Sequence, residues 1–481
     1  MNVFHRTFPG WLLLTAAVAA GPSYAQSPGH PLLTIETLPW RETNWRTVPV
    51  RRLEDLPNYN ATQTDTSLGR FGGLAARKVA GPGFFRVQKV DNRWWMVDPD
   101  GCLFLNRGVD SVNTGGSSSA REATRAQKFG TKEQWASQTL QLLRDNGFNG
   151  TACWSDDALL GRGPQRIPYT PRLGLMGAYK QERRKTATFS SPPPGKSGYP
   201  ADAIPVFDPE FPAFCDRLAQ PIAATKDDPY LIGYFSDNEL PFLRNTLDGF
   251  LLLDPQDPGY HAALDFLQAQ HGSGADPKAI TDNDRQKFVA LVGEKYFSIV
   301  SKAIKKYDPN HLFLGSRFHS HVMDQPLFMQ KVGPYIDVVG INYYGQWTPN
   351  PERLARWTAT SGKPFIITEF YAKGADTGMG NTSGAGWVVK TQRDRGLFYE
   401  QFTLGLLENR GCVGWHWFQY IDNDPEGKAD PSNNNSNKGI VNTKYEPYQP
   451  LLEEMKRVNT RAYGLITYFD RNPSSVPLAP H

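Results

Sequence analysis

The stretch YLIGYFSDNELPF, residues 230–242, changes from apolar to acidic without an intervening loop. Its first half is rich in aliphatic and aromatic residues, which suit the interior of a β-sheet. Asp237, Asn238 and Glu239 follow that half directly. A buried strand that ends in acids and an amide is typical of α/β proteins whose functional site lies at the carboxyl ends of the strands.

Seven further apolar segments behave as strands, and helical segments separate most of them. Eight such strands, most of them followed by a helix, predict a (β/α)8 TIM barrel. A doubly wound open sheet is the main alternative, but no Gly-rich phosphate fingerprint opens its first turn. The predicted strands are 102–110, 148–155, 173–180, 230–242, 311–319, 336–345, 363–371 and 412–420, and the predicted helices are 131–147, 211–228, 285–309, 351–362 and 392–411.

The first 25 residues have the features of a signal peptide. His5 and Arg6 give a weakly basic start, residues 11–20 form an apolar centre, and Ser23-Tyr24-Ala25 resembles a cleavage site. A buried N-terminal helix is the alternative. No later stretch approaches the roughly 20 apolar residues that a membrane span requires. We therefore predict a periplasmic or secreted protein, cleaved near Ala25, with no membrane span in the mature chain.

The remaining chain is predicted to divide into three parts. Residues 84–101 contain two apolar runs around a polar turn, which indicates a hairpin within a small β-rich N-terminal extension, 26–95. The barrel then occupies 96–465, and 466–481 forms a C-terminal tail.

Composition limits the partners and cofactors. The net charge is only +4, which does not favour a nucleic-acid partner. The acidic run 421–430 lacks the ordered spacing of an EF-hand, and we expect no metal and no cofactor. The four cysteines also lack metal-ligand spacing, so they are core thiols or form one bridge. Cys102 and Cys412 begin the first and last predicted strands, where the barrel closes, and are the candidate pair.

Glu239 and Glu369 each follow an apolar strand directly, on predicted strands four and seven. A single glutamate at such a position can be a helix cap or a salt-bridge partner. Two of them face each other across the mouth of a barrel. Glycoside hydrolysis needs such a pair, because one carboxyl protonates the leaving oxygen while the other attacks the anomeric carbon or activates water.

These motifs resemble clan A of the retaining glycoside hydrolases, with Asn238-Glu239 closing strand four and Glu369 in FIITEF closing strand seven. Residues 227–240 and 414–425 are similar to glycoside hydrolase family 50, the β-agarases, and its relatives. The resemblance implies that Glu239 is the acid/base, that Glu369 is the nucleophile and that Tyr344 keeps the nucleophile ionised.

Other strand-end residues are candidate substrate contacts. Asn238 can bind the sugar 2-hydroxyl, and Asn342 and Tyr344 share one face of strand six, although Tyr343 can be the inward residue instead. Asp237 is expected to support them and to point away from the sugar. One of Trp415 and Trp417, which share a face of strand eight, is expected to stack on the sugar, and Arg107 is expected to lie beside Glu369. Further candidate sugar contacts are Trp154, Arg317, His319 and His416. A purely structural role remains the alternative for each of these residues.

The Gly-rich segment 373–387 is expected to close over the cleft, with Asn381 or Trp387 contacting sugar. Together these features predict an exported β-glycoside hydrolase that works with retention on a β-linked galactan of the agarose type. A β-galactosidase or β-glucanase is the alternative within the class. A transglycosylase and a sugar-binding protein that has lost catalysis are the alternatives outside it.

Overall fold

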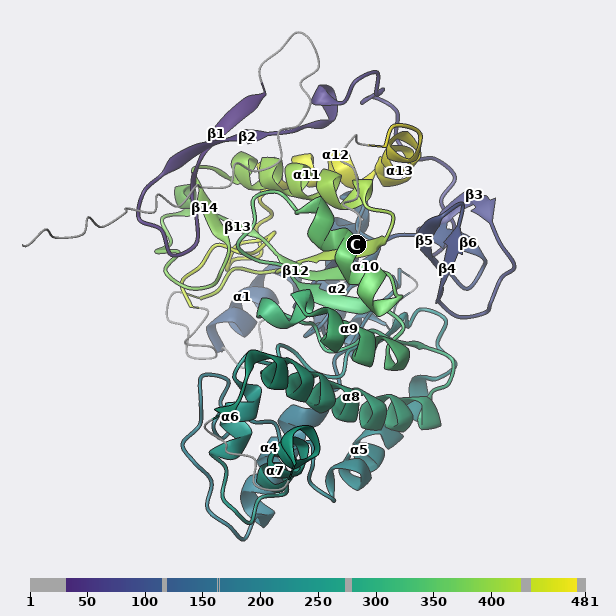
Figure 1. Ribbon diagram of the computed structural model, residues 1–481. Coiled ribbons are helices and arrows are strands. Elements are labelled where there is room, and N and C mark those ends of the chain that lie inside the picture. The colour runs from purple at the N-terminus through teal and green to yellow at the C-terminus, as the bar shows by residue number, and fades with distance from the viewer. Residues whose placement is uncertain are drawn as a thin grey trace, which may run out of the picture.

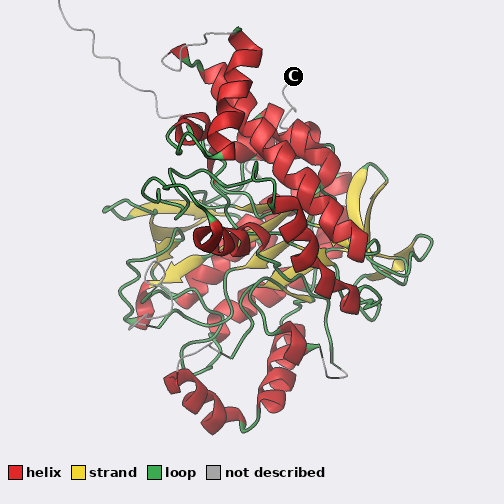
Figure 2. Ribbon diagram, turned by 90° about the horizontal axis from the view of Figure 1, so that it is seen from below, coloured by secondary structure: helices red, strands yellow, loops and turns green. Residues whose placement is uncertain are grey.

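The computed structural model describes residues 32–473, apart from 115–118, 162, 164, 273–278 and 425–433. The predicted signal peptide, 1–25, lies outside the described residues. The parallel strands lie in the middle of the molecule among helices, while the two four-stranded sheets lie toward its edges (Figures 1 and 2). The chain therefore has the mixed α/β architecture that the sequence predicts.

Seven strands form two parallel sheets in the centre. The larger has the order β11-β12-β15-β7-β8, and the smaller pairs β10 with β9. These assigned sheets do not close on each other. Single parallel bridges stand between them, joining Tyr169 to Thr151 and Leu231, and Phe318 to Ile341. The strands are β7 (Asn106–Val109), β8 (Gly150–Thr151), β9 (Gly233–Tyr234), β10 (Leu312–Phe313), β11 (Val339–Asn342), β12 (Phe365–Phe370) and β15 (Cys412–Trp417).

The third predicted strand is wrong. Residues 173–180 lie largely in helix α4 (Leu175–Thr186), whose buried residues Leu175, Met176, Tyr179 and Arg183 recur at helical spacing. That spacing is the sequence signal for a helix, and the short apolar run concealed it. The parallel bridges around Tyr169 occupy the position that strand three was expected to fill.

The first predicted strand is two strands in different sheets. Its beginning, β6 (Cys102–Phe104), belongs to an antiparallel N-terminal sheet of order β3-β6-β5-β4, while β7 belongs to the parallel sheet. The N-terminal sheet therefore extends beyond the predicted boundary at residue 95. Its other strands are β3 (Leu74–Lys78), β4 (Arg86–Val90) and β5 (Arg93–Val97).

The predicted hairpin is confirmed in this sheet. Val90 pairs with Arg93, which leaves Asp91 and Asn92 as a two-residue turn. Both have positive φ angles, 50° and 63°, and Asn and Asp tolerate that conformation better than most residues.

Four of the five predicted helices are confirmed with small shifts of their ends, whereas the helix predicted over 211–228 is an α-helix only to Ala219 and continues as a 3-10 helix, Gln220–Thr225. Three begin at a threonine, Thr131, Thr281 or Thr391, whose side chain accepts a backbone N–H in a capping box. The described α-helices are α1 (Ser119–Phe129), α2 (Lys132–Asp145), α3 (Asp157–Leu160), α4, α5 (Phe211–Ala219), α6 (Thr246–Leu251), α7 (Pro258–His271), α8 (Asp282–Tyr307), α9 (Pro326–Val332), α10 (Pro351–Ser361), α11 (Gln392–Glu408), α12 (Gln449–Asn459) and α13 (Ala462–Arg471).

The N-terminal hairpin is bonded to the segment that follows β12. Strands β1 (Leu33–Leu38) and β2 (Arg46–Val50) join β14 (Trp387–Val389) and β13 (Ala372–Gly374) in the order β13-β14-β1-β2. The beginning of the described chain therefore holds the Gly-rich segment in place.

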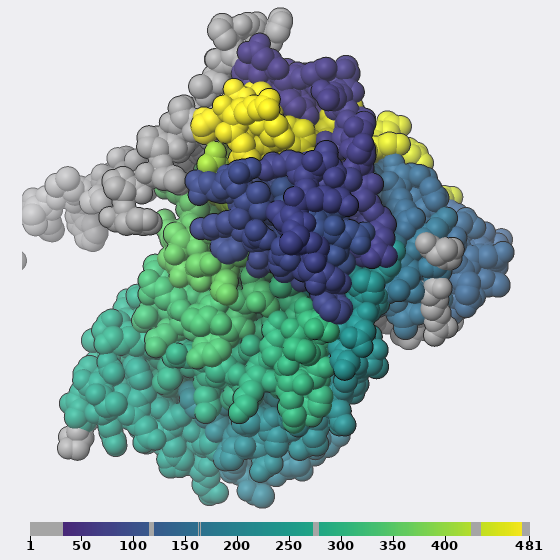
Figure 3. All heavy atoms as spheres, turned by 90° about the vertical axis from the view of Figure 1, so that its right-hand side faces the viewer, coloured from purple at the N-terminus to yellow at the C-terminus, as the bar shows by residue number. Residues whose placement is uncertain are grey.

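The C-terminal helices pack against the N-terminal sheet, so these two parts of the chain, far apart in sequence, lie side by side (Figure 3). Trp95 stacks on Tyr463 of α13 with ring centroids 6.2 Å apart. The buried Arg93 donates to Asp470 and to the carbonyls of Leu407 and Asn409. The residues predicted to form a tail from 466 therefore begin within a helix.

All four cysteines are buried and free, so the candidate bridge between Cys102 and Cys412 does not form. Cys102 lies in the antiparallel sheet, whereas Cys412 begins β15 of the parallel sheet. Within the described part of the chain, none of the helices combines the length and apolarity needed to cross a lipid bilayer.

Candidate active site

Glu369 lies near the carboxyl end of β12 and is 6% exposed. Each of its carboxylate oxygens accepts a hydrogen bond: Oε1 from Arg317 Nη2 at 2.8 Å and Oε2 from the Tyr344 hydroxyl at 2.5 Å. Burial raises the pKa of Glu369, and the Arg317 charge and the Tyr344 hydrogen bond oppose that rise. These two donors therefore favour the ionised carboxylate that a nucleophile needs.

Arg317 is fully buried and binds a second carboxylate, Asp110, through contacts of 3.2 and 3.1 Å. Its Nη2 also donates to the carbonyl of Thr368 at 2.7 Å. Burial raises the pKa of Asp110 to about 7, while Arg317 lowers it. A guanidinium fixed by these partners cannot rotate away from Glu369, so its position is set before any substrate arrives.

Glu239 is half-buried and accepts a hydrogen bond from Asn342 Nδ2 at 2.8 Å. The same amide nitrogen lies 3.2 Å from Asn238 Oδ1. Asn342 Oδ1 in turn accepts from Arg317 Nε at 3.4 Å and from the Thr368 hydroxyl. A continuous path of hydrogen bonds therefore runs from Glu239 through Asn342 and Arg317 to Glu369.

Three residues of this region have left-handed backbones: Trp154 (φ 63°), Glu239 (φ 51°) and Arg317 (φ 49°). Such conformations are uncommon for residues other than glycine and cluster at functional sites. The amide of Glu239 donates to the carbonyl of Arg317 at 3.3 Å, which ties two of them together.

Asp237 differs from its two neighbours in direction. Its carboxylate is buried and accepts from the amides of Met176 and Gly177, at the start of α4, and from the Tyr296 hydroxyl of α8. Asp237 thus fixes two helices against β9, and its expected direction away from the sugar stays a prediction.

Half-buried rings surround the glutamates. Trp154 lies under the guanidinium of Arg317, 4.4 Å from the ring centroid, and contacts Phe418 edge to face at 6.0 Å. Tyr344 contacts Tyr371, which in turn packs against Phe418. Phe418 and Tyr371 are not among the predicted site residues, although each lies in the last part of a predicted strand, 412–420 or 363–371. Tyr371 is buried, so the half-buried rings of Trp154 and Phe418 offer the apolar surface on which a pyranose can stack.

The stacking role predicted for Trp415 and Trp417 is wrong. Both are fully buried, and their indole nitrogens donate to the Tyr399 hydroxyl of α11 and to the carbonyl of Lys438. They share a face of β15, as expected from strand alternation, but it is the face toward the helices.

His416 lies on the opposite face of β15 and is also inaccessible. Its ring packs against Gly108, and its Nε2 is 2.7 Å from Asn106 Oδ1. Burial and the Arg317 charge lower the pKa of His416 to about 3. It supports the floor of the site and does not contact sugar.

Arg107 does not approach Glu369. It is buried, donates to the carbonyl of Gly147 and lies over the Tyr463 ring at 5.2 Å. Arg317 supplies the cation instead. His319 is half-buried, and its Nδ1 has no hydrogen-bond partner among the described residues.

The segment 373–387 packs closely against Tyr371. A Cβ atom at Gly384 or Gly386 would collide with the Tyr371 side chain, so both positions need glycine. Trp387 is only 6% exposed and packs on Trp347, and the sugar contact expected of Asn381 or Trp387 stays a prediction. Asn381 is occupied within the protein, donating to the carbonyl of Gly374 and accepting from the amide of Asn437.

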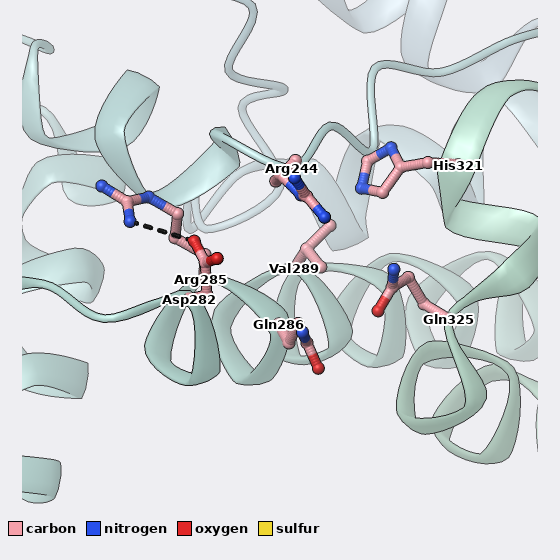
Figure 4. Close-up of a pocket in the computed structure, with 7 residues that line it drawn as sticks. All are labelled: Arg244, Asp282, Arg285, Gln286, Val289, His321 and Gln325. Carbon is pink, nitrogen blue, oxygen red and sulfur yellow. Dashed lines mark hydrogen bonds and ion pairs between the residues drawn. The ribbon is translucent and has the colours of Figure 1, made fainter. Parts of the chain in front are cut away.

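A small cavity of about 10 Å³ lies beside α8, near the loop that follows Glu239 (Figure 4). Arg244 and His321 point toward each other there. Burial and Arg244 lower the pKa of His321. The cavity holds about one water and is too small for a sugar ring. Among the described residues, no group of three or more His, Cys, Asp or Glu side chains is arranged to hold a metal ion.

Comparison with solved structures identifies the family. The crystal structure of BpGH50 superposes with a TM-score of 0.81 and 30% sequence identity, over 94% of this chain and 99% of that one. The chain belongs to glycoside hydrolase family 50. A solved exo-β-agarase has the same fold, with a TM-score of 0.71, 23% identity, and coverage of 84% of this chain and 68% of that one. A scan against protein-family models gives no match.

Two curated relatives come from Vibrio sp. (strain JT0107). β-Agarase B is 26% identical over 498 residues, covering 82% of this chain and 50% of the relative. β-Agarase A is also 26% identical, covering 80% of this chain and 46% of the relative. This family 50 chain thus spans about half the length of the curated relatives that it matches.

Proposed function

We propose that the protein is a retaining β-glycoside hydrolase that acts on a β-linked galactan of the agarose type. The observation that carries this proposal is the pair of donors on Glu369, connected through Asn342 to a second carboxyl, Glu239. The relatives named β-agarases support the choice of substrate.

In this proposal Glu239 protonates the glycosidic oxygen while Glu369 attacks the anomeric carbon and forms a glycosyl-enzyme. Glu239 then removes a proton from the incoming water, and the sugar leaves with its configuration retained. Asn342 positions Glu239 through the 2.8 Å contact. Asn238 is assigned to the sugar 2-hydroxyl, and Trp154 and Phe418 to the faces of the sugar rings.

For the fold we propose a (β/α)8 barrel. The parallel bridges at Tyr169 and Phe318, which stand between the two parallel sheets, support a ring of eight strands. Of the proposed catalytic glutamates, Glu239 comes after β9 and Glu369 lies near the carboxyl end of β12, which is where barrel active sites lie. The N-terminal sheet and the C-terminal helices are assigned to the barrel as packed extensions.

We also propose that the protein is exported to the periplasm or secreted, with cleavage near Ala25. The basic start, apolar centre and small residues of the first 25 positions support this. A polymeric galactan is too large to enter a cell intact, so its hydrolase must meet it outside. N-terminal sequencing of the mature protein tests the cleavage site.

The test of the activity is a panel of agarose, other β-galactans, β-glucans and aryl β-galactosides. We expect new reducing ends from agarose, with the β-anomer appearing first by NMR. Glu369→Gln should abolish turnover, and Glu239→Gln should lower it by about 10² to 10⁴-fold, least for good leaving groups. Cleavage of β-glucan alone, or initial release of the α-anomer, would contradict the proposal. Transfer to added acceptor sugars in preference to water would indicate a transglycosylase.

A further inference from the structure

A second, larger cavity lies at the opposite end of the parallel strands from the glutamates. Its volume is about 650 Å³, and Gly411, which precedes β15, lines it. Phe418 at the active site follows the same strand. Because β15 has six residues, and a strand rises about 3.3 Å per residue, the two ends are about 20 Å apart. The cavity is therefore separate from the proposed active site.

Four elements build its walls. The β4–β5 hairpin contributes Trp94, α10 contributes one helical face that includes Ala355 and Thr358, the end of α11 contributes Glu408, and α13 contributes Phe469. This is the side of the molecule where the N-terminal sheet meets the C-terminal helices (Figure 3). All these walls belong to packed secondary structure, and a cavity of this volume falls in the range of preformed ligand sites.

The cavity has an aromatic wall and incomplete polar contacts. Trp94 is half-buried, and its backbone amide is fixed by the carbonyl of Arg410 at 2.8 Å. Two covered polar atoms of the walls, Trp94 Nε1 and Thr358 Oγ1, have no hydrogen-bond partner in the described part of the chain. Both atoms are covered within the walls, so the surface that the cavity offers to a ligand is the exposed part of the Trp94 side chain rather than these two atoms.

The charges around the cavity balance. Glu408 is paired with Arg51 at 2.7 Å, and Arg410 lies 3.3 Å from Asp470. Two exposed charges of opposite sign remain on the rim: Glu352, and Lys89, whose ammonium lies 5.2 Å from the centroid of the Trp94 ring and so covers part of one of its faces. A neutral ligand suits this balance better than an anion or a cation. An aromatic face combined with scattered hydrogen-bonding groups is the arrangement that binds the apolar face and the hydroxyls of a sugar.

We infer that this cavity, which we call the Trp94 pocket, is a non-catalytic binding site for a neutral saccharide, namely a segment of the polysaccharide that the active site cuts. This inference rests on the proposed function for the identity of the sugar. Such a site holds the enzyme on its polymer while the glutamates act about 20 Å away. It does not take part in bond cleavage.

The experiment measures the retardation of the protein in native gels that contain each polysaccharide of the panel. The Glu369→Gln background prevents hydrolysis during the run. We expect Trp94→Ala to weaken binding to the polymer about three- to tenfold, which corresponds to an aromatic stacking contact. Ala359→Arg, which places bulk at the exposed edge of the pocket while keeping good helix propensity, should have the same effect. Trp40→Ala is the matched control, because Trp40 is 42% exposed and lies outside the pocket.

The wild-type background separates this inference from the proposed function. There, Trp94→Ala should leave kcat on a short oligosaccharide within about twofold and raise the KM for the polymer. If another polysaccharide than agarose is hydrolysed, the proposed substrate is wrong, and Trp94 is tested on the polymer that is cut. Unchanged retardation of both pocket variants, equal losses in Trp40→Ala, or no retardation by any polysaccharide would each overturn the inference.

Discussion

The Tyr344 hydroxyl donates to Oε2 of Glu369 over 2.5 Å, on the side of the carboxylate that Arg317 does not occupy. Tyr344 lies just beyond β11 and Glu369 in the neighbouring β12, which pairs with it. Each oxygen of the proposed nucleophile thus has one donor of its own. One donor is a fixed charge and the other is a neutral hydroxyl, and each can be removed separately.

Tyr344→Phe removes the hydroxyl and keeps the ring against Tyr371. Because a hydrogen bond to a charged group contributes about 1.5–3 kcal/mol, kcat/KM should fall about 10- to 100-fold. The ionised form of Glu369 loses a donor, so the pKa of this carboxyl rises and the acidic limb of the pH profile of kcat/KM moves to higher pH. An acidic limb that stays in place would show that Tyr344 only packs.

Arg317→Gln leaves two buried carboxyls, Asp110 and Glu369, without their cation. We expect a loss of about 3–5 kcal/mol in the free energy of unfolding at neutral pH. Burial already raises the pKa of Asp110 to about 7, so in the wild type the folded state binds more protons than the unfolded state and stability falls as pH rises from about 4 to 7. Without Arg317 that fall extends to higher pH.

Urea unfolding at pH 5 and pH 8 checks this expectation, and the loss should be larger at pH 8. Arg317→Lys is the control, because it keeps a positive charge and loses only the fork geometry. Equal losses at both pH values for Arg317→Gln would mean that the carboxyls are not coupled to this cation.

His416 supplies a stability effect of the opposite sign. Burial and the Arg317 charge lower its pKa to about 3, below about 6.5 in an unfolded chain. Between these values the unfolded state binds the additional proton, so stability falls as pH decreases from about 6.5 to 3, by up to about 1.4 kcal/mol per pH unit. In His416→Gln, the pH dependence of the free energy of unfolding should be flatter over this window. Identical slopes in both proteins would contradict the burial of a neutral imidazole.

Lys373 stabilises the segment that packs against Tyr371. Its ammonium donates to three carbonyls, those of Asn381, Ser383 and Gly384. Lys373→Met leaves these acceptors without that donor and should lower the free energy of unfolding by at least about 2 kcal/mol. Lys390→Met is the matched control, since that side chain is 42% exposed and lies 3.8 Å from Glu36. Its loss should not exceed about 1 kcal/mol in the same urea titration.

The sequence was most informative where the polar residues directly follow a strand. Asn238, Glu239, Asn342, Tyr344 and Glu369 were selected on that ground, and the structure brings them into one hydrogen-bonded group. The reason is geometric, because the carboxyl ends of parallel strands lie at the same end of the sheet. Their chemical roles remain proposals.

The wrong predictions concern side chains whose direction changes when the strand is shifted by a single residue. Strand alternation correctly placed Trp415 and Trp417 on one face but could not tell which face points toward α11. The same ambiguity led the sequence to place Arg107 beside Glu369, where the structure has Arg317. Arg317 lies outside β10 and has a left-handed backbone conformation. Pattern alone does not reveal such a conformation.

The pairing of β1 with β14 also bears on how the chain acquires its structure. Roughly 350 residues separate the two strands, and at about 5–20 residues per second the ribosome needs tens of seconds to make them. During that time β1 has only its hairpin partner β2, and two strands alone are marginally stable. The segment beside Tyr371 is therefore completed late, by a strand that was made roughly 350 residues earlier.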